Sequence, residues 1–327
     1  IIIIDYNIII NENILYLQKK TLQMRRKVSL IGPSTLMVSL PSRWVKRHML
    51  KKGDELEVEE KECQLIVSTN DAERTMAVKT DFSDFQGMVL RGLAAIYKKG
   101  YDDVEITFDN PAALSSIQEA LRKEISYYEI VEQGKSFCRL KSVAETKPEE
   151  FEPILRRTFI TMLNMAEDMA SSMRSGDFTG LERACFLEET NNKYTTFCRR
   201  SINKHSTTKP ENAVFMYLIV EQLEKIADQY KYLCQSLSEA KKNEMPCDKS
   251  IALFERHTAV FRLFYECFYK YDKSRIMEIS RARKEIVNDA LSMIQKSSGK
   301  ETLLLHHTLT STQQVFALLG PYLAMHF

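Results

Sequence analysis

Residues 40–58 read LPSRWVKRHMLKKGDELEV, and this stretch decides how the amino-terminal part of the chain folds. The Pro-Ser pair at 41–42 begins a short helical turn, in which Trp44 and Val45 are spaced to bury one side while the basic residues face water. The Gly-Asp pair at 53–54 then forms a turn. Alternating apolar positions after this turn predict two further strands, which carry Leu56, Val58, Leu65 and Val67.

A hairpin is predicted just before this stretch. Short apolar runs at 28–31 and 36–40 flank the Gly-Pro-Ser triplet at 32–34, which is a strong turn signal. A module of this size exposes too much apolar edge to be stable by itself. We therefore expect it to dimerise.

The charge of the same region has one sign. Residues 24–53 contain eight lysines and arginines and no aspartate or glutamate, although the net charge of the whole 327-residue chain is only +2. Fixed cations gain affinity by displacing counterions from phosphates, so the stretch indicates a polyanion partner, with nucleic acid as the first candidate. The alternative interpretation is that these charges only solvate a small surface.

The order of a strand, a proline, a short basic helix and a Leu-x-x-Gly-Asp-x-apolar segment resembles the SpoVT/AbrB swapped-hairpin DNA-binding domain. The resemblance covers about 24–68, within a domain that we place at 24–70. It implies two interlocked chains and basic residues near the strand ends that contact double-stranded DNA, although some relatives use the fold only to dimerise. The implied contact residues are Arg26, Lys27, Arg43, Lys46 and Arg47. We add their basic neighbour Arg25 to this set.

The rest of the chain predicts two further parts, which makes the whole a multidomain α+β protein. In residues 71–147, strands at 74–79, 104–108, 128–131 and 137–140 alternate with helices at 82–99 and 111–124, which indicates a small α/β sandwich. We interpret this part as a spacer or a ligand-sensing domain. Residues 148–327 show six amphipathic segments, at about 151–173, 181–205, 210–240, 250–271, 273–296 and 301–325. Six helices with short connections predict two three-helix bundles, at about 151–240 and 250–327.

One pair of carboxylates in the helical part has the spacing of a cation site. Glu224 and Asp228 are four residues apart, so in a helix both project from one face, one turn apart. The alternative is that they lie on a solvated face and pair with Lys225 or Lys231. Oxygen ligands favour magnesium or manganese over zinc.

The segment at 223–228 resembles a metal-binding motif of PhoU proteins. The amino-terminal domain at 24–70 (the head), the middle part at 71–147 and the helical part at 148–327 (the tail) together resemble archaeal phosphate-uptake regulators. The resemblance implies a divalent or trivalent metal ion at Glu224 and Asp228, with Glu188 and Glu189 as companion ligands. The chain departs from the motif where Asn191 or Asn192 replaces an expected acid. A second copy of the motif is also missing, since Ala317 lies where an acid is expected.

These resemblances imply a regulator of phosphate uptake. Its head would bind DNA as a dimer, and its tail would sense phosphate status through a protein partner such as a phosphate ABC transporter ATPase or a sensor kinase. The alternative is an adaptor that docks on such a partner without binding DNA. No common nucleotide-binding, hydrolase or metalloprotease motif is present, so we expect no enzymatic activity.

Two further features concern the location of the protein. Polar residues interrupt the apolar runs of residues 1–23, so this stretch predicts neither a signal peptide nor a membrane span, and we interpret it as a non-native extension or a disordered arm. The seven cysteines contain no Cys-x-x-Cys pair, which is typical of reduced thiols in a cytoplasmic protein.

Overall fold

The structure is a computed structural model that describes residues 25–61, 64–69, 75–144, 146–205, 210–240 and 244–327. The predicted extension at 1–23 lies outside these residues. The chain divides into two compact units, Ile1–Arg74 and Thr75–Phe327. Within the described part, none of the helices is both long and apolar enough to cross a bilayer.

The first unit consists of two hairpins with a short helix between them. Strands β1 (Ser29–Ile31) and β2 (Thr35–Met37) pair antiparallel around Gly32, whose φ of +66° suits glycine in a tight turn. Helix α1 (Ser42–Arg47) follows Pro41. Strands β3 (Leu56–Lys61) and β4 (Gln64–Thr69) form the second antiparallel pair. The order of elements predicted from residues 28–67 is confirmed.

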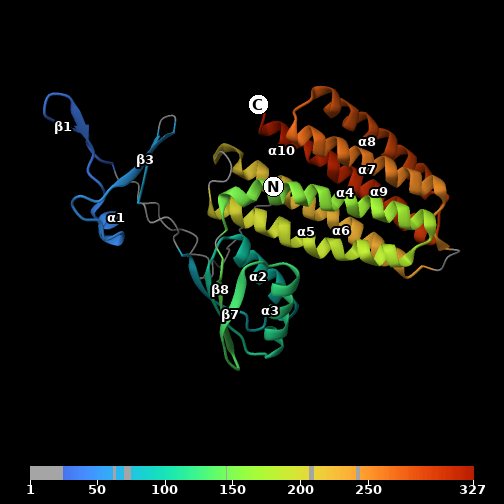
Figure 1. Cartoon of the computed structure of the whole chain (residues 1–327), viewed down its shortest axis with the longest axis horizontal. Coiled ribbons are helices and arrows are strands. Elements are labelled where there is room, and N and C mark those ends of the chain that lie inside the picture. Colours follow the sequence, from blue (N-terminus) through green and yellow to red (C-terminus); the bar gives the residue numbers. More distant parts are fainter. Residues whose placement is uncertain (1–24, 62–63, 70–74, 145, 206–209, 241–243) are drawn as a thin grey trace, which may run out of the picture. The chain divides into compact units, whose positions relative to one another are not determined.

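The second unit begins with a four-stranded sheet. Its elements in chain order are β5 (Ala77–Asp81), α2 (Val89–Lys98), β6 (Asp103–Thr107), α3 (Ala112–Lys123), β7 (Tyr128–Gln133) and β8 (Phe137–Ser142). The strands lie in the order β5-β6-β8-β7, with β5 parallel to β6 and the other neighbours antiparallel. Both helices lie beside the sheet (Figure 1).

Alternation along these strands separates a buried face from a charged one. Val104, Ile106 and Leu140 are fully buried, together with Leu93 of α2 and Ile117 of α3. The other face carries ion pairs that are partly open to water, including Arg139 with Asp103 at 2.6 Å and Lys79 with Glu105 at 2.7 Å. The predicted small α/β sandwich is therefore confirmed.

One predicted helix of the sandwich begins later than expected. The pattern predicted a helix from residue 82, but α2 begins at Val89 after a short 3₁₀ turn, Gln86–Met88. The Asp81 carboxylate accepts hydrogen bonds from the Ser83 amide and hydroxyl at 3.1 and 2.8 Å, and Asp84 has a φ of +59°. This side chain competes with the backbone for the amide of the first turn, which delays the helix.

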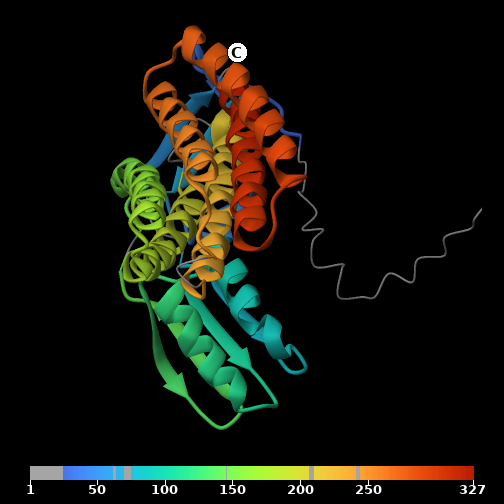
Figure 2. The same ribbon diagram turned by 90° about the vertical axis from the view of Figure 1, so that its right-hand side faces the viewer.

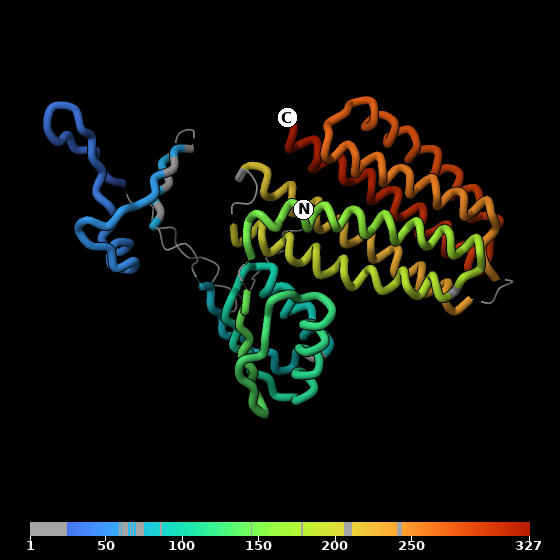
Figure 3. Tube along the Cα trace, in the orientation of Figure 1, coloured from blue at the N-terminus to red at the C-terminus, as the bar shows by residue number. Residues whose placement is uncertain are grey.

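The remaining helices form two adjoining three-helix groups. Helices α4 (Phe151–Ser175), α5 (Phe178–Lys204) and α6 (Ala213–Ser238) make the first group, whose antiparallel course is clear in Figure 3. Helices α7 (Asp248–Tyr269), α8 (Lys273–Ile294) and α9 (Gly299–Ala317) make the second, and they run alongside the first group in Figure 2. The predicted pair of bundles is confirmed, and the two share one continuous apolar core.

The end of the chain differs from the prediction of one helix over 301–325. The helix breaks at Leu318, and a short helix α10 (Leu319–Ala324) follows. Its Tyr322 is buried and donates a hydrogen bond of 2.5 Å to the Cys267 carbonyl of α7. This contact ties the carboxyl-terminal turn to the second bundle.

Arg200 joins the α/β sandwich to the helices. It lies on α5, its side chain is 1 % exposed, and its guanidinium donates to the Tyr97 and Tyr101 carbonyls at 3.0 and 2.7 Å and to Asp102 Oδ1 at 2.6 Å. Asp102 also accepts from Lys204 Nζ at 2.5 Å. The sandwich and the first bundle therefore meet through a buried charged contact.

A polar group lies inside the core where α6 meets the second bundle. His257 of α7 is fully buried, and its two ring nitrogens lie 2.7 Å from the Tyr230 hydroxyl and 3.0 Å from Thr312 Oγ1. Burial lowers the pKa of His257 from 6.5 to about 3, so the imidazole is neutral at physiological pH.

Acid is expected to destabilise the fold through His257. The unfolded chain binds a proton near pH 6.5 but the folded chain does not until about pH 3, so stability falls as the pH drops through this range. At about pH 5 the loss from this residue is about 2 kcal/mol. Urea unfolding of the wild type and His257→Gln at about pH 7.5 and pH 5 measures it. The variant should lose less stability between the two pH values, and an equal loss would contradict the prediction.

Candidate functional site

All six basic residues predicted to contact DNA are exposed. Arg43, Lys46 and Arg47 lie on α1, and the other three precede β1. Among the described residues, no carboxylate forms an ion pair with any of them. Their charges are therefore available to a partner, although the assignment of DNA contacts to these residues stays a prediction.

The same unit leaves its apolar side chains uncovered. Leu36 is 70 % exposed and Leu65 is 69 % exposed, and α1 has no buried residue. Val58 and Leu30 are also more than half exposed. Several large apolar side chains exposed on one small unit indicate an interaction surface. A single copy of this unit therefore lacks an apolar core of its own within the described residues.

Two of the four predicted metal ligands share a lysine. Lys231 Nζ donates to Glu188 Oε1 at 2.7 Å and to Asp228 Oδ1 at 2.6 Å. Glu188 is 4 % exposed and also accepts from Asn192 Nδ2 at 2.7 Å. The structure thus brings Glu188 and Asp228 together, with an ammonium group between them.

The other two predicted ligands pair with arginines. Glu224 forms an ion pair with Arg199, which also pairs with Glu221. Glu189 lies 3.8 Å from Arg122 of α3. Glu224 therefore belongs to a different ion-pair group from Glu188 and Asp228. Within the residues that the structure describes, no group of three or more His, Cys, Asp or Glu side chains could hold a metal ion.

Burial shifts two ionisable side chains near Arg199. Burial is the main cause that raises the pKa of Glu124, at the end of α3, and Glu224 adds to the shift. Burial also lowers the pKa of Lys98 of α2, and the nearby Arg199 lowers it further. Charged groups of the sandwich and of the α5–α6 pair therefore influence one another.

Sequence reasoning missed the arginines at the centre of these contacts. Arg199 and Arg200 are among the largest fully buried side chains of the protein, although adjacent arginines are usually exposed. The available signal was the spacing of Glu221 and Glu224, which places both on one helix face. The sequence pattern marks Asn191 only as the replacement of an acid. In the structure it is fully buried, and neither of its side-chain polar atoms has a partner among the described residues.

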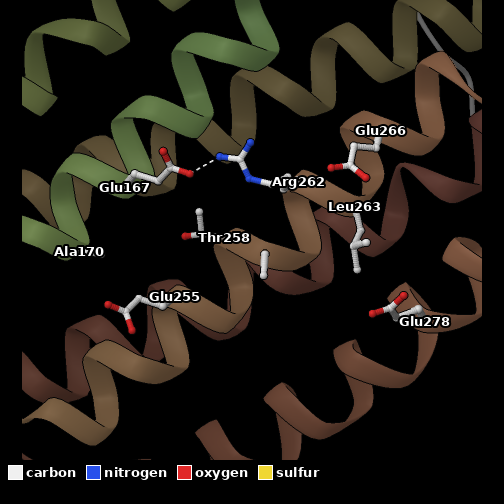
Figure 4. A pocket seen from close by; sticks show the side chains of 9 residues that line it. Glu167, Ala170, Glu255, Thr258, Arg262, Leu263, Glu266 and Glu278 are labelled. Atoms are coloured by element: carbon white, nitrogen blue, oxygen red, sulfur yellow. Dashed lines mark hydrogen bonds and ion pairs between the residues drawn. The ribbon is translucent and has the colours of Figure 1, made fainter.

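A groove lies in the helical unit between α4, α7 and α8. Figure 4 shows Glu167 of α4 bonded across it to Arg262 of α7, with Glu278 of α8 on the far side. The groove has a volume of about 450 Å³ and includes Ala170 and Leu263 in its lining. Several lining carboxylates are paired with arginines, and the set contains no nucleophile with an adjacent base.

Comparisons with known proteins address the two units separately. Residues 30–71 match the family model described as antidote-toxin recognition MazE, bacterial antitoxin. The amino-terminal unit is similar to that family. A comparison with curated proteins found no match.

Among solved structures, the chain is similar to the phosphate transport system regulatory protein PhoU from Streptococcus pneumoniae. The two are 10 % identical, the TM-score is 0.45, and the alignment covers 55 % of this chain and 94 % of that chain.

Proposed function

We propose that the protein is a DNA-binding regulator of phosphate uptake, whose amino-terminal unit pairs with a second copy and grips a duplex. One observation carries the part of the proposal that concerns DNA binding and pairing. Six exposed cations without carboxylate partners among the described residues share a small unit with an uncovered apolar surface. The first feature supports a polyanion partner, and the second supports pairing.

Pairing of two copies has a clear physical reason. Two-stranded hairpins are marginal in water unless another layer covers their apolar side chains. A second copy supplies such a layer, since its own Leu36, Val58 and Leu65 are equally uncovered. A two-fold pair uses the same patch on both chains, and it therefore needs no further partner.

Pairing also doubles the charge that faces a duplex. Six cations from each chain can neutralise phosphates on both strands, and the released counterions supply the binding free energy. These contacts position the protein on DNA but do not by themselves select a sequence.

We expect the double variant Leu36→Glu/Leu65→Glu to be a monomer that no longer binds DNA. Both side chains are about 70 % exposed in one copy, so glutamate is tolerated there, but it places charge in the apolar interface of the pair. Sedimentation equilibrium measures the mass, and fluorescence anisotropy with a labelled duplex measures binding.

The matched control is Phe186→Glu/Val214→Glu, since these residues of the helical unit are 69 % and 67 % exposed. This control should remain a dimer and bind DNA. A wild-type protein that is monomeric at micromolar concentration would contradict the pairing, as would a Leu36/Leu65 variant that stays dimeric.

The helical unit would sense phosphate status through a protein partner. The segment at 223–228, which resembles the PhoU motif, supports a phosphate-related role, and a phosphate ABC transporter ATPase or a sensor kinase is the partner class that this role implies. The groove between α4, α7 and α8 is a candidate surface for such a protein. This part of the proposal is tested by co-purification with the transporter ATPase at low and high phosphate.

A second candidate function is an adaptor whose head serves only for protein contacts. The match to a family of antitoxins that recognise toxins favours it, because that description names protein recognition. The two functions differ in one result: an adaptor captures its partner with no measurable affinity for a duplex at low salt.

A further inference from the structure

We infer that Lys231 and Arg199 are the resident cations of the α5–α6 pair, and that they hold the carboxylates which the resemblance assigns to a metal ion. The inference concerns the helical unit alone. It does not depend on the proposed function of the head.

Lys231 takes the position between two acids on neighbouring helices. Its ammonium group uses two donors on Glu188 of α5 and Asp228 of α6, at 2.7 and 2.6 Å. Asn192 satisfies Glu188 further with a hydrogen bond of 2.7 Å. A carboxylate that is 4 % exposed needs such partners, because an unpaired buried charge is strongly destabilising.

Arg199 does the same at a second position of the helix pair. It lies eleven residues after Glu188 on α5, which is about three helical turns. Its side chain is 1 % exposed, and its two terminal nitrogens pair with Glu221 and Glu224 of α6. Nε donates to the Thr195 carbonyl at 3.3 Å. The rigid guanidinium fork suits two carboxylates one turn apart.

Two short hydrogen bonds hold the Lys231 ammonium group in place. It donates to both carboxylates, and these charge-assisted contacts offset the cost of burying the three groups together. A metal ion could reach Glu188 and Asp228 only by displacing a charged, hydrogen-bonded group. The residues present therefore do not fit a resident metal, and the protein's own cations replace it.

The other predicted ligands agree with this assignment. Glu189 lies beside Arg122, and Asn191 offers a neutral amide in place of an acid. The predicted pair Glu224 and Asp228 is divided between Arg199 and Lys231. Each of the four predicted metal ligands thus lies beside a basic side chain.

The test compares melting temperatures of the full chain with and without metal. Wild-type protein should melt at the same temperature, within about 1 °C, in EDTA, in Mn²⁺ and in Zn²⁺, because no ligand binds the folded state. Lys231→Met should lower the melting temperature by about 5 °C or more, since it leaves the buried Glu188 carboxylate without a cation and with only the Asn192 hydrogen bond. The control Lys225→Met removes an exposed lysine that lies six residues before Lys231, about 1.7 helical turns away. Lys225 lies 3.8 Å from Glu221, and its loss should have little effect.

A double variant separates the ion pair from general packing. Glu188→Gln/Lys231→Met removes both charges and should recover most of the melting temperature lost in Lys231→Met. A double variant that melts lower than Lys231→Met would overturn the inference. It would also be overturned if Mn²⁺ or Zn²⁺ raised the wild-type melting temperature and Glu188→Gln abolished that rise.

Discussion

Replacing Arg43 and Arg47 by glutamate is expected to weaken binding to a duplex by at least about 100-fold at low salt. Both side chains are exposed on α1. In a pair of chains the double variant removes four cations and adds four anions, which repel the phosphates that the wild type attracts. Fluorescence anisotropy with a labelled duplex of about 30 base pairs in about 50 mM salt measures the change.

The control for this prediction carries the same charge change on the helical unit. Lys249→Glu/Lys284→Glu replaces two exposed lysines and should bind the duplex almost as tightly as the wild type. Circular dichroism should show that both variants are folded, because all four positions are exposed. Equal loss in the two variants would mean that net charge, rather than the basic surface of the head, determines binding.

Replacing Arg200 by methionine is expected to cause the largest loss of stability of any single substitution considered for this protein, about 3–5 kcal/mol. Methionine removes one of the two cations that contact Asp102, and it leaves the carbonyls of Tyr97 and Tyr101 without the Arg200 donors. It also removes a guanidinium that lies 4.6 Å from the centre of the Tyr97 ring. Lys204 still contacts Asp102, which limits the loss.

Urea unfolding measures this effect, with Arg183→Met as the control on the same helix. Arg183 is 71 % exposed and forms one surface ion pair with Asp177 at 3.4 Å, so its loss should change the free energy of unfolding by less than about 0.5 kcal/mol. If Arg200→Met unfolds at the same urea concentration as Arg183→Met, the buried contacts of Arg200 with the sandwich do not contribute to stability.

The sequence was most informative where local signals act alone. The Gly-Pro-Ser turn, the proline at 41 and the Gly-Asp pair at 53–54 fix the order of hairpin, helix and hairpin, because each restricts the backbone directly. The long helices could also be located from the sequence, because one apolar face repeated along a segment is enough to predict a helix. The late start of α2 was missed because the Asp81 side chain, rather than apolar spacing, sets it.

The candidate sites depend on partners that are distant in sequence, and there prediction from spacing was incomplete. Spacing placed Glu224 and Asp228 on one face of a helix, but it could not show which cations of other turns or helices lie opposite. Arg199 looks like an ordinary surface residue until α6 is packed against α5. Arg200 likewise contacts Asp102 only when the sandwich packs against α5.

The most direct test of the central claim is the salt dependence of duplex binding by the wild-type chain. If paired heads neutralise at least six phosphates, the logarithm of the binding constant falls against the logarithm of salt concentration with a slope of about −5 or steeper. A folded dimer that shows no binding even in about 20 mM salt, or whose binding does not change with salt, would contradict the claim.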